Sequence, residues 1–242
     1  VGHNIGHHVY TNLRGHDYVW SPATKAEYDA MPAWRRALER FYRSGFGMGA
    51  YYAVELWWKT LLVPGAAQRA RPDGVFLRDT ALVAAFAALW LGGLVAAALA
   101  TGQAPWLLLA CGFLLPFALW NVTMGAVIYF HHTHPDVAWY DDIHQWEAAR
   151  DGCSGTVHIT FPGPLGAVLN HIMQHPVHHL DVRIPLYRLA EAQAELSAHA
   201  PRTIGQAFGP THVLDCLRRC KLYDYENRQW TDFDGVATSP AM

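Results

Sequence analysis

Histidine is the residue type in this 242-residue chain whose number and spacing could do chemistry, because fifteen are present. Three groups of histidines are closely spaced. They are His3, His7 and His8 (an HxxxHH pattern), then His131, His132 and His134, then His175, His178 and His179 (an HxxHH pattern). Residues three or four apart on a helix lie on one face, so several rings of one group can reach the same ion. The spacing therefore predicts a metal site.

The number of histidines favours two ions over one. Neutral imidazole suits Zn, Cu, Fe and Ni, and a catalytic zinc takes about three protein ligands. The three groups hold nine histidines, so at least seven candidate ligands are available, which exceeds the need of one ion. Two adjacent ions with nitrogen-rich ligands suit dioxygen activation better than hydrolysis, because a redox-active pair can share the electrons that splitting O₂ requires. We predict two non-haem iron ions, although the residues alone leave other transition metals open.

Several further residues are candidates for supporting roles at this site. An additional ligand, or a contact that orients a ligand, is predicted for His131, His134 and His171. Asp141 and Asp181 lie near the histidine groups and could accept the far ring N–H of a ligand. The remaining histidines are predicted to be surface or hydrogen-bonded residues: His16, His144, His158, His199 and His212.

An uncharged region lies between the first and third histidine groups and contains the second at its end. No Asp, Glu, Lys or Arg occurs from Thr80 to Pro135, and the region holds two apolar stretches, Thr80–Gly102 and Ala104–Phe130. Twenty-three residues make about 34 Å of helix, enough to cross a hydrocarbon layer of about 30 Å. A soluble helix of this length would carry a polar face. We predict a transmembrane hairpin with a very short turn.

The basic residues orient this hairpin. Residues 1–79 hold ten Lys and Arg, residues 131–242 hold the other eight, and the turn holds none. The positive-inside bias places both flanks in the cytoplasm. All fifteen histidines lie on these flanks, so they face the same side of the membrane. The predicted fold class is all-α integral membrane: a transmembrane helical hairpin with a cytosolic helical cap that carries the histidine groups. The expected location is the bacterial inner membrane.

The chain is expected to form a single domain over 1–242. Its parts are a cytosolic segment with an interfacial helix (1–79), the two spans (80–130), and a cytosolic segment with a tail (131–242). The interfacial or re-entrant helix is placed at Phe41–Val63, with an ordinary amphipathic packing helix as the alternative. A tail helix is predicted near Thr211–Leu222. Interfacial anchoring is predicted, ahead of a substrate-tunnel wall, for Trp57, Trp58, Trp120 and Trp139.

Composition excludes several other classes of protein. The formal net charge of −2 argues against a phosphate-binding or nucleic-acid-binding protein. Four cysteines without a CxxC pair argue against a disulfide scaffold and a zinc ribbon, and Cys216 and Cys220 are expected to be packing residues. No signal peptide is recognisable. Because a histidine group lies three residues from Val1, we expect a fragment that lacks an upstream part.

These motifs resemble those of the membrane fatty acid desaturases, whose signature is three histidine boxes around a di-iron centre. His3–His8 followed by Tyr10-Thr11-Asn12 is similar to the second box. His132-Thr133-His134-Pro135-Asp136 resembles the segment after the last membrane helix in the Δ12/ω-6 branch. His175–His179 with Ile184-Pro185-Leu186-Tyr187 is similar to the third box. The resemblance covers nearly the whole chain.

The resemblance implies an O₂-dependent desaturase that introduces a cis double bond into an acyl lipid or acyl-CoA. It also implies an electron donor of the ferredoxin or cytochrome type, and a first HxxxH box upstream of Val1. His131 stands where the family usually has Gln, so the ligand role passes to His132. The ligands that the resemblance implies are therefore His3, His7, His8, His132, His175, His178 and His179. His175 stands where front-end desaturases have Gln, which favours the Δ12/ω-6 type.

Two alternatives remain open. The same boxes serve hydroxylases and ketolases that act on alkanes or carotenoids. A divalent-metal transporter could also carry histidine clusters, but transporters place ionisable residues within their spans, and residues 80–130 contain none of Asp, Glu, Lys, Arg or His.

Overall fold

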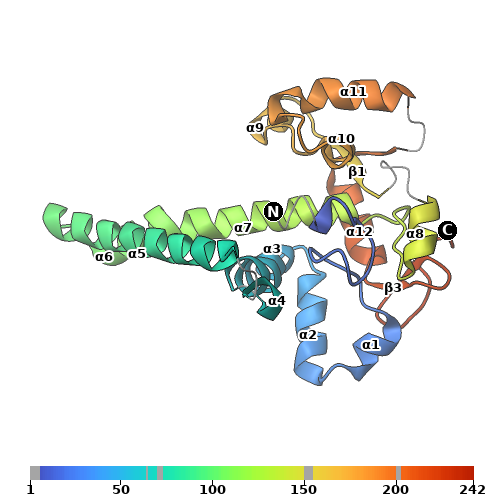
Figure 1. The fold of residues 1–242 in the computed structure, drawn as a ribbon, viewed down its shortest axis with the longest axis horizontal. Coiled ribbons are helices and arrows are strands. Elements are labelled where there is room, and N and C mark those ends of the chain that lie inside the picture. The colour runs from blue at the N-terminus through green and yellow to red at the C-terminus, as the bar shows by residue number, and fades with distance from the viewer. Residues whose placement is uncertain (1–5, 64, 70–72, 150–154, 200–202) are drawn as a thin grey trace. The chain divides into compact units, whose positions relative to one another are not determined.

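The structure is a computed structural model, and it describes the chain except residues 1–5, 64, 70–72, 150–154 and 200–202 (Figure 1). The chain divides into two compact units. Unit 1 combines Val1–Gly45 with Val127–Met242, and unit 2 is Phe46–Ala126. The histidine groups at the two ends of the sequence therefore belong to one unit.

Unit 2 is helical wherever the structure describes a regular element. Its elements are α3 (Met48–Tyr51), the π-helix η2 (Tyr52–Leu62), α4 (Ala66–Arg69), α5 (Val75–Thr101), α6 (Pro105–Leu109), the π-helix η3 (Ala110–Leu114) and the first part of α7 (Leu115–His132). The elements α6, η3 and α7 follow one another without interruption as one long helix, Pro105–His132.

The two long apolar helices predicted from the sequence are confirmed. The helices Val75–Thr101 and Pro105–His132 have 27 and 28 residues, and only 6% of the most apolar window of each is buried. A core helix of a soluble protein would be mostly buried, so this exposure favours a lipid environment. Gly102, with φ of 71°, ends the first helix, and Pro105 starts the second, where its missing N–H costs nothing. The first helix begins at Val75 rather than at Thr80 and so includes Arg78 and Asp79.

Side-chain contacts hold these two helices together. Trp90 Nε1 donates a hydrogen bond of 3.1 Å to the carbonyl oxygen of Gly112. A Cβ atom at Gly112 would lie 2.8 Å from the Leu94 side chain, so the missing side chain lets the helices approach.

A second close approach joins α3 to α7 and gives a testable prediction. A Cβ atom built at Gly125 would overlap the backbone of Met48, whereas one at Gly93 has nothing within 4 Å. We expect Gly125→Ala to lower the free energy of unfolding by about 1–3 kcal/mol, because rigid backbone must shift. The matched variant Gly93→Ala should be neutral or stabilising, since alanine favours a helix more than glycine does. Unfolding in detergent measures both, and equal stability of the two variants would contradict this packing.

The prediction of one interfacial helix over Phe41–Val63 is wrong in one respect. The segment breaks after Tyr42, and the break falls at the division between the two units. Gly45 and Gly47 lie in it, and glycine is a poor helix former. Phe41 therefore belongs to α2 (Ala33–Tyr42) of unit 1, while α3 and η2 belong to unit 2.

Unit 1 is mostly helical with two small sheets. Its helices besides α2 and the end of α7 are α1 (Lys25–Ala30), α8 (Ile143–Ala149), α9 (Leu165–Val168), α10 (His175–Leu180), the 3₁₀-helix η4 (Leu186–Arg188), α11 (Leu189–His199) and α12 (Pro210–Arg219). Its strands are β1 (Val157–Thr160), β2 (Ile204–Ala207), β3 (Leu222–Asp224) and β4 (Gln229–Thr231).

The strands correct the all-α prediction. β1 pairs with β2 in parallel, with Val157 opposite Ile204, and β3 pairs with β4 antiparallel, with Leu222 opposite Thr231. Each strand has only three or four residues, too few for a clear alternating pattern. The predicted tail helix also ends earlier than expected: α12 stops at Arg219, and Leu222 opens β3. Cys216 and Cys220 are buried, in agreement with their predicted packing role.

Aromatic side chains form the core beside the end of α7. The Trp20 ring lies 5.2 Å from that of Trp139 and stacks on that of Trp230 at 5.9 Å. Trp139 is fully buried, and its Nε1 donates a hydrogen bond of 3.2 Å to the carbonyl oxygen of His132. Interfacial anchoring is therefore wrong for Trp139. Its indole instead holds the last residue of α7.

Candidate metal centre

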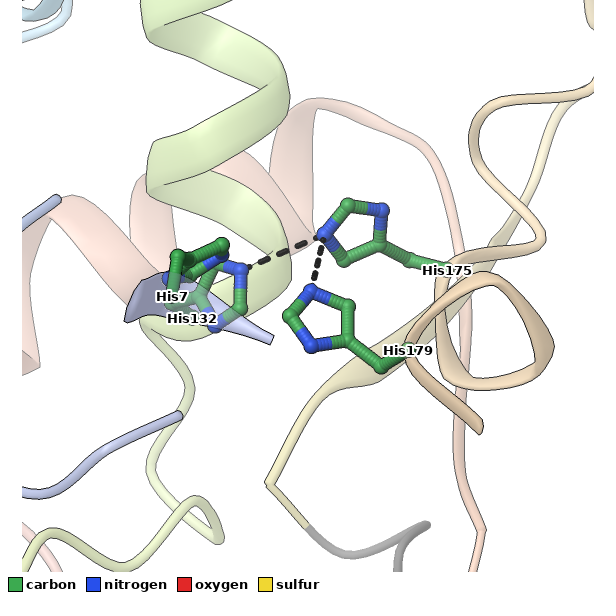
Figure 2. Close-up of side chains that lie close together, drawn as sticks. All are labelled: His7, His132, His175 and His179. Carbon is green, nitrogen blue, oxygen red and sulfur yellow. Dashed lines mark hydrogen bonds between the residues drawn. The ribbon is translucent and has the colours of Figure 1, made fainter. Parts of the chain in front are cut away.

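Four histidines from three separate segments meet in unit 1. They are His7, His132, His175 and His179, and one ring nitrogen of each lies within 4.8 Å of the others (Figure 2). His175 Nε2 lies 3.2 Å from His132 Nε2 and 3.1 Å from His179 Nε2. The rings come from the turn at 6–10, the end of α7, and α10. These ring nitrogens lie close together although their residues are far apart in the sequence, so they form a preassembled nitrogen cluster.

The third histidine group is positioned by the start of α10. The helix begins at His175, with Pro176 as its second residue. Proline is tolerated in the first turn, where its N–H would have no helical partner. The next N–H, that of Val177, donates to Gln193 Oε1 of α11 at 3.3 Å. A side chain from a neighbouring helix thus caps α10 and sets the direction of its histidines.

Three further histidine rings adjoin these four. His8 stacks on His179 with ring centroids 4.2 Å apart, and the His178 ring lies 4.6 Å from that of His8. His131 stacks on His175 at 4.1 Å and is fully buried. Six of the seven predicted ligands therefore lie in one group: His7, His8, His132, His175, His178 and His179. The seventh, His3, lies outside the described residues.

Two other supporting candidates, His134 and His171, make contacts outside this group. The His134 ring lies 5.9 Å from that of His212, and its Nδ1 accepts a hydrogen bond of 3.2 Å from the backbone N–H of Asp136. His171 occupies a turn with φ of 57°, and its backbone N–H donates to the Gly166 carbonyl oxygen at 2.8 Å. Neither is among the four clustered nitrogens.

The predicted carboxylate partners are wrong. Asp181 bonds instead to Arg183, with Oδ2 to Nη2 at 2.8 Å, and these hydrogen bonds lower the pKa of Asp181 to about 2. Asp141 is exposed. Both lie next to a histidine group in the sequence, but their side chains are turned toward solvent or a neighbouring cation.

Asp17 takes the role that these carboxylates were expected to fill. Its Oδ1 lies 2.9 Å from His7 Nδ1, and both side chains are at least 98% buried. A carboxylate only accepts, so His7 donates from Nδ1 and keeps a lone pair on Nε2. The backbone N–H groups of Asn12 and Val19 also donate to Asp17, at 3.1 and 3.0 Å. No pattern in the sequence distinguishes Asp17, because its burial comes from the fold.

Thr11 links the second box to the third and was likewise not predicted as part of the site. Its hydroxyl donates to the His7 carbonyl oxygen at 2.7 Å, so its oxygen can accept from His179 Nδ1 at 2.9 Å. His175 Nδ1 lies 3.3 Å from the carbonyl oxygen of Ile172, which also only accepts. Both rings thus carry their proton on Nδ1 and a lone pair on Nε2.

The positions of the ring protons and lone pairs test whether these residues fit a metal ion. The Nε2 atoms of His175 and His179 are 3.1 Å apart, and two lone pairs at that distance repel unless a cation lies between them. Metal–imidazole bonds of about 2.0–2.1 Å place two ligand nitrogens roughly 3 Å apart. Burial, together with the neighbouring histidines, lowers the pKa of His175 and of His179 well below 6.5. The rings are therefore neutral at neutral pH, which is the form that binds a metal. The cluster fits a transition-metal ion.

The Thr11 contact gives a prediction with a matched pair of variants. Thr11→Val keeps the shape of the side chain but removes the acceptor for His179 Nδ1, so metal affinity should fall by about tenfold. Thr11→Ser keeps the hydroxyl and should bind nearly as tightly as the unsubstituted chain. Titration with Co²⁺, followed by its visible absorption, measures both. An equal loss in the two variants would show that the hydroxyl does not orient His179.

The chain is similar to known fatty acid desaturases. A family model described as fatty acid desaturase matches residues 1–209. The chain is 26% identical over 237 residues to a chloroplastic omega-6 fatty acid desaturase of Brassica napus, covering 96% of this chain and 50% of the relative. It is 27% identical over 233 residues to an sn-1 oleoyl-lipid 12-desaturase of Synechocystis sp., covering 91% and 60%. An sn-1 acyl-lipid omega-3 desaturase (ferredoxin) of Synechocystis sp. is 27% identical over 201 residues, covering 77% and 50%. The chain spans half to three fifths of the length of these relatives.

Proposed function

Because this chain belongs to the fatty acid desaturase family, we propose that it carries the second and third histidine boxes of an O₂-dependent acyl-chain desaturase. The observation that carries this proposal is the convergence of imidazoles from both boxes on one buried point. A catalytic zinc takes about three protein ligands, so this many imidazoles fits two ions better than one, and imidazole is a suitable ligand for iron. The product is an acyl chain with a new cis double bond, and O₂ is reduced to water.

The proposed ligands are His3, His7, His8, His132, His175, His178 and His179, with His131 as a further candidate beside His175. Two non-haem iron ions held there would supply the oxidising power to remove hydrogen from an unactivated C–H bond. The chain's own residues hold and orient these ligands. Asp17 and Thr11 keep the ring protons of His7 and His179 on Nδ1, and the aromatic core around Trp139 holds His132 and excludes water.

The Δ12/ω-6 specificity and the acyl-lipid substrate are also part of the proposal. They are supported by relatives named as omega-6 and sn-1 oleoyl-lipid 12-desaturases. A ferredoxin as one-electron donor is supported by the relative whose name includes it, with a cytochrome-type donor as the alternative.

The two exposed apolar helices support a membrane arrangement. We place them as a hairpin across the membrane, with the flanks and the metal centre in the cytoplasm, as the distribution of Lys and Arg favours. A bacterial inner membrane is the proposed location. The single domain expected over 1–242 stays a prediction.

Fatty acid profiling tests the function. The complete protein is expressed in a host that lacks polyunsaturated lipids, with a ferredoxin and its reductase, and total acyl chains are analysed by mass spectrometry. A product lighter than its precursor by two hydrogens supports desaturation. A product heavier by one oxygen would instead identify a hydroxylase, and unchanged acyl chains in cells that contain the metal-loaded protein would contradict both assignments.

A further inference from the structure

Asn12, four residues after His8 of the second histidine box, has a left-handed backbone. Its φ is 62°, a conformation that asparagine tolerates better than most residues with a side chain. The residue is only 2% exposed, and its Oδ1 has no hydrogen-bond partner among the residues that the structure describes. Both features cost stability, because the backbone is strained and a buried oxygen loses its solvation. Such costs persist where the surrounding structure imposes them, often at a functional site.

The side-chain amide of Asn12 joins two distant segments of unit 1. Its Nδ2 donates hydrogen bonds to the carbonyl oxygens of Ala138, at 3.2 Å, and Gly155, at 2.7 Å. A carbonyl oxygen only accepts, so the two acceptors fix the direction of the amide by requiring both of its N–H donors. The N–H of Tyr140 also donates to the Asn12 carbonyl oxygen, at 3.0 Å. Asn12 therefore fastens the second-box segment to residues 138–140 and to Gly155.

Each of these segments continues into another histidine group. Ala138 belongs to the stretch that directly follows the second group. Gly155 lies just before β1, and in that strand the N–H of Ile159 donates to the Met173 carbonyl oxygen at 3.2 Å. Met173 in turn lies two residues before His175. Short connections therefore run from this one side chain to all three histidine groups.

The backbone around Asn12 also holds the residues that orient two ligands. The Asn12 N–H donates to Asp17 Oδ2 at 3.1 Å, and the other oxygen of Asp17 accepts from His7 Nδ1. The preceding residue is Thr11, whose hydroxyl oxygen accepts from His179 Nδ1. A displacement of Asn12 would therefore disturb the partners of His7 and His179 at the same time.

We propose that Asn12 is a positioning residue of the metal centre. Its amide sets how far the second box lies from the other two histidine groups, and it acts through Asp17 and Thr11 rather than as a ligand. This inference rests on the proposed metal centre and deepens it, because it names the contact that brings the three groups together. Loss of the two N–H donors should loosen the second box while every histidine stays in the chain.

Cobalt binding by the full chain tests this role. Asn12→Gly permits the same φ but removes the amide, and Asn12→Asp keeps the size of the side chain but offers at most one donor for the two carbonyl oxygens. Each variant should bind Co²⁺ about 10- to 100-fold more weakly than the unsubstituted chain, as expected for a residue that orients metal ligands. The visible absorption of the bound Co²⁺ should also change, because it reports the coordination geometry.

The matched control is Gly125→Ala, which should weaken packing within unit 2, outside the segments that Asn12 joins. This variant should lose stability but keep both the Co²⁺ affinity and the absorption of the unsubstituted chain. Near-ultraviolet circular dichroism restricts the comparison to folded protein, and a folded sample of either Asn12 variant is enough to decide.

Four results would overturn the proposal. Unchanged Co²⁺ affinity and absorption in a folded Asn12 variant would show that the amide only stabilises the fold. An equal change in Gly125→Ala would show that any loss of stability weakens the site. Failure of both Asn12 variants to fold would likewise leave this residue a structural role alone. If the unsubstituted chain itself bound no Co²⁺, the metal centre of the proposed function would be contradicted, and the positioning role with it.

Discussion

Replacing His175 with alanine should abolish metal binding by the cluster and desaturation by the complete protein. His175 is the central ring of the group, because its Nε2 lies within 3.2 Å of Nε2 of both His132 and His179. Loss of a residue that only orients a ligand commonly costs 10- to 100-fold in metal affinity or activity. Loss of a ligand should therefore cost at least about 100-fold. Elemental analysis of the purified protein and fatty acid profiling measure the two effects.

The control for this variant is His199→Ala. His199 is exposed on α11, and its Nδ1 lies 2.8 Å from the carbonyl oxygen of Glu195. It should keep full metal content and activity. Because His175 is buried, His175→Gln should accompany the alanine variant and retain most of the side-chain volume. Normal metal content in a folded His175→Gln protein would remove His175 from the ligand set.

His178→Ala should also abolish desaturation while the apolar helices stay intact. His178 is outside the four clustered nitrogens, but its ring adjoins that of His8. If the cluster holds two ions, the two alanine variants should differ in the number of metal ions bound per protein. The His178 variant should keep more metal than the His175 variant. Wild-type product formation by His178→Ala would discredit its ligand role.

The second large effect is expected at Asp17. Asp17→Asn keeps the size of the side chain but removes the negative charge that holds the His7 proton on Nδ1. Metal affinity should fall by about 10- to 100-fold, and activity with it. The amide also offers N–H groups where the backbone N–H groups of Asn12 and Val19 already donate, so some loss of stability is expected. Metal titration measures the affinity, and unfolding in detergent measures the stability.

Asp141→Asn is the matched control, since Asp141 also lies near a histidine group in the sequence but is exposed. Unchanged metal affinity is expected for it. Asp17→Glu provides a second comparison that keeps the charge and shifts its position. If Asp17→Asn bound metal as tightly as the Asp141 variant, the His7–Asp17 contact would have only a structural role.

The two apolar helices could be predicted because their signal is local and long. Fifty-six consecutive residues without Asp, Glu, Lys or Arg leave few alternatives to a lipid environment. The pattern did not predict where the first helix begins, because the charged residues Arg78 and Asp79 fall inside α5. The short strands of unit 1 were missed, because strands of three or four residues depend on pairing with partners elsewhere in the chain.

The sequence by itself determined the residue types of the metal site, because histidines at helical spacing are rare enough to be recognised without a structure. It also determined the long apolar helices, because their pattern is likewise local and strong. Only the tertiary structure decided which side chains orient the ligands. Asp17 and Thr11 qualify through burial and a single hydrogen bond each to a ring, while Asp141 and Asp181 do not, although they are as close in sequence. It also decided that Arg43 is buried with its guanidinium over the Trp20 ring. The contacts of Thr11 with His179 and of Arg43 with Trp20 join residues from different segments of the chain, and no local pattern encodes them.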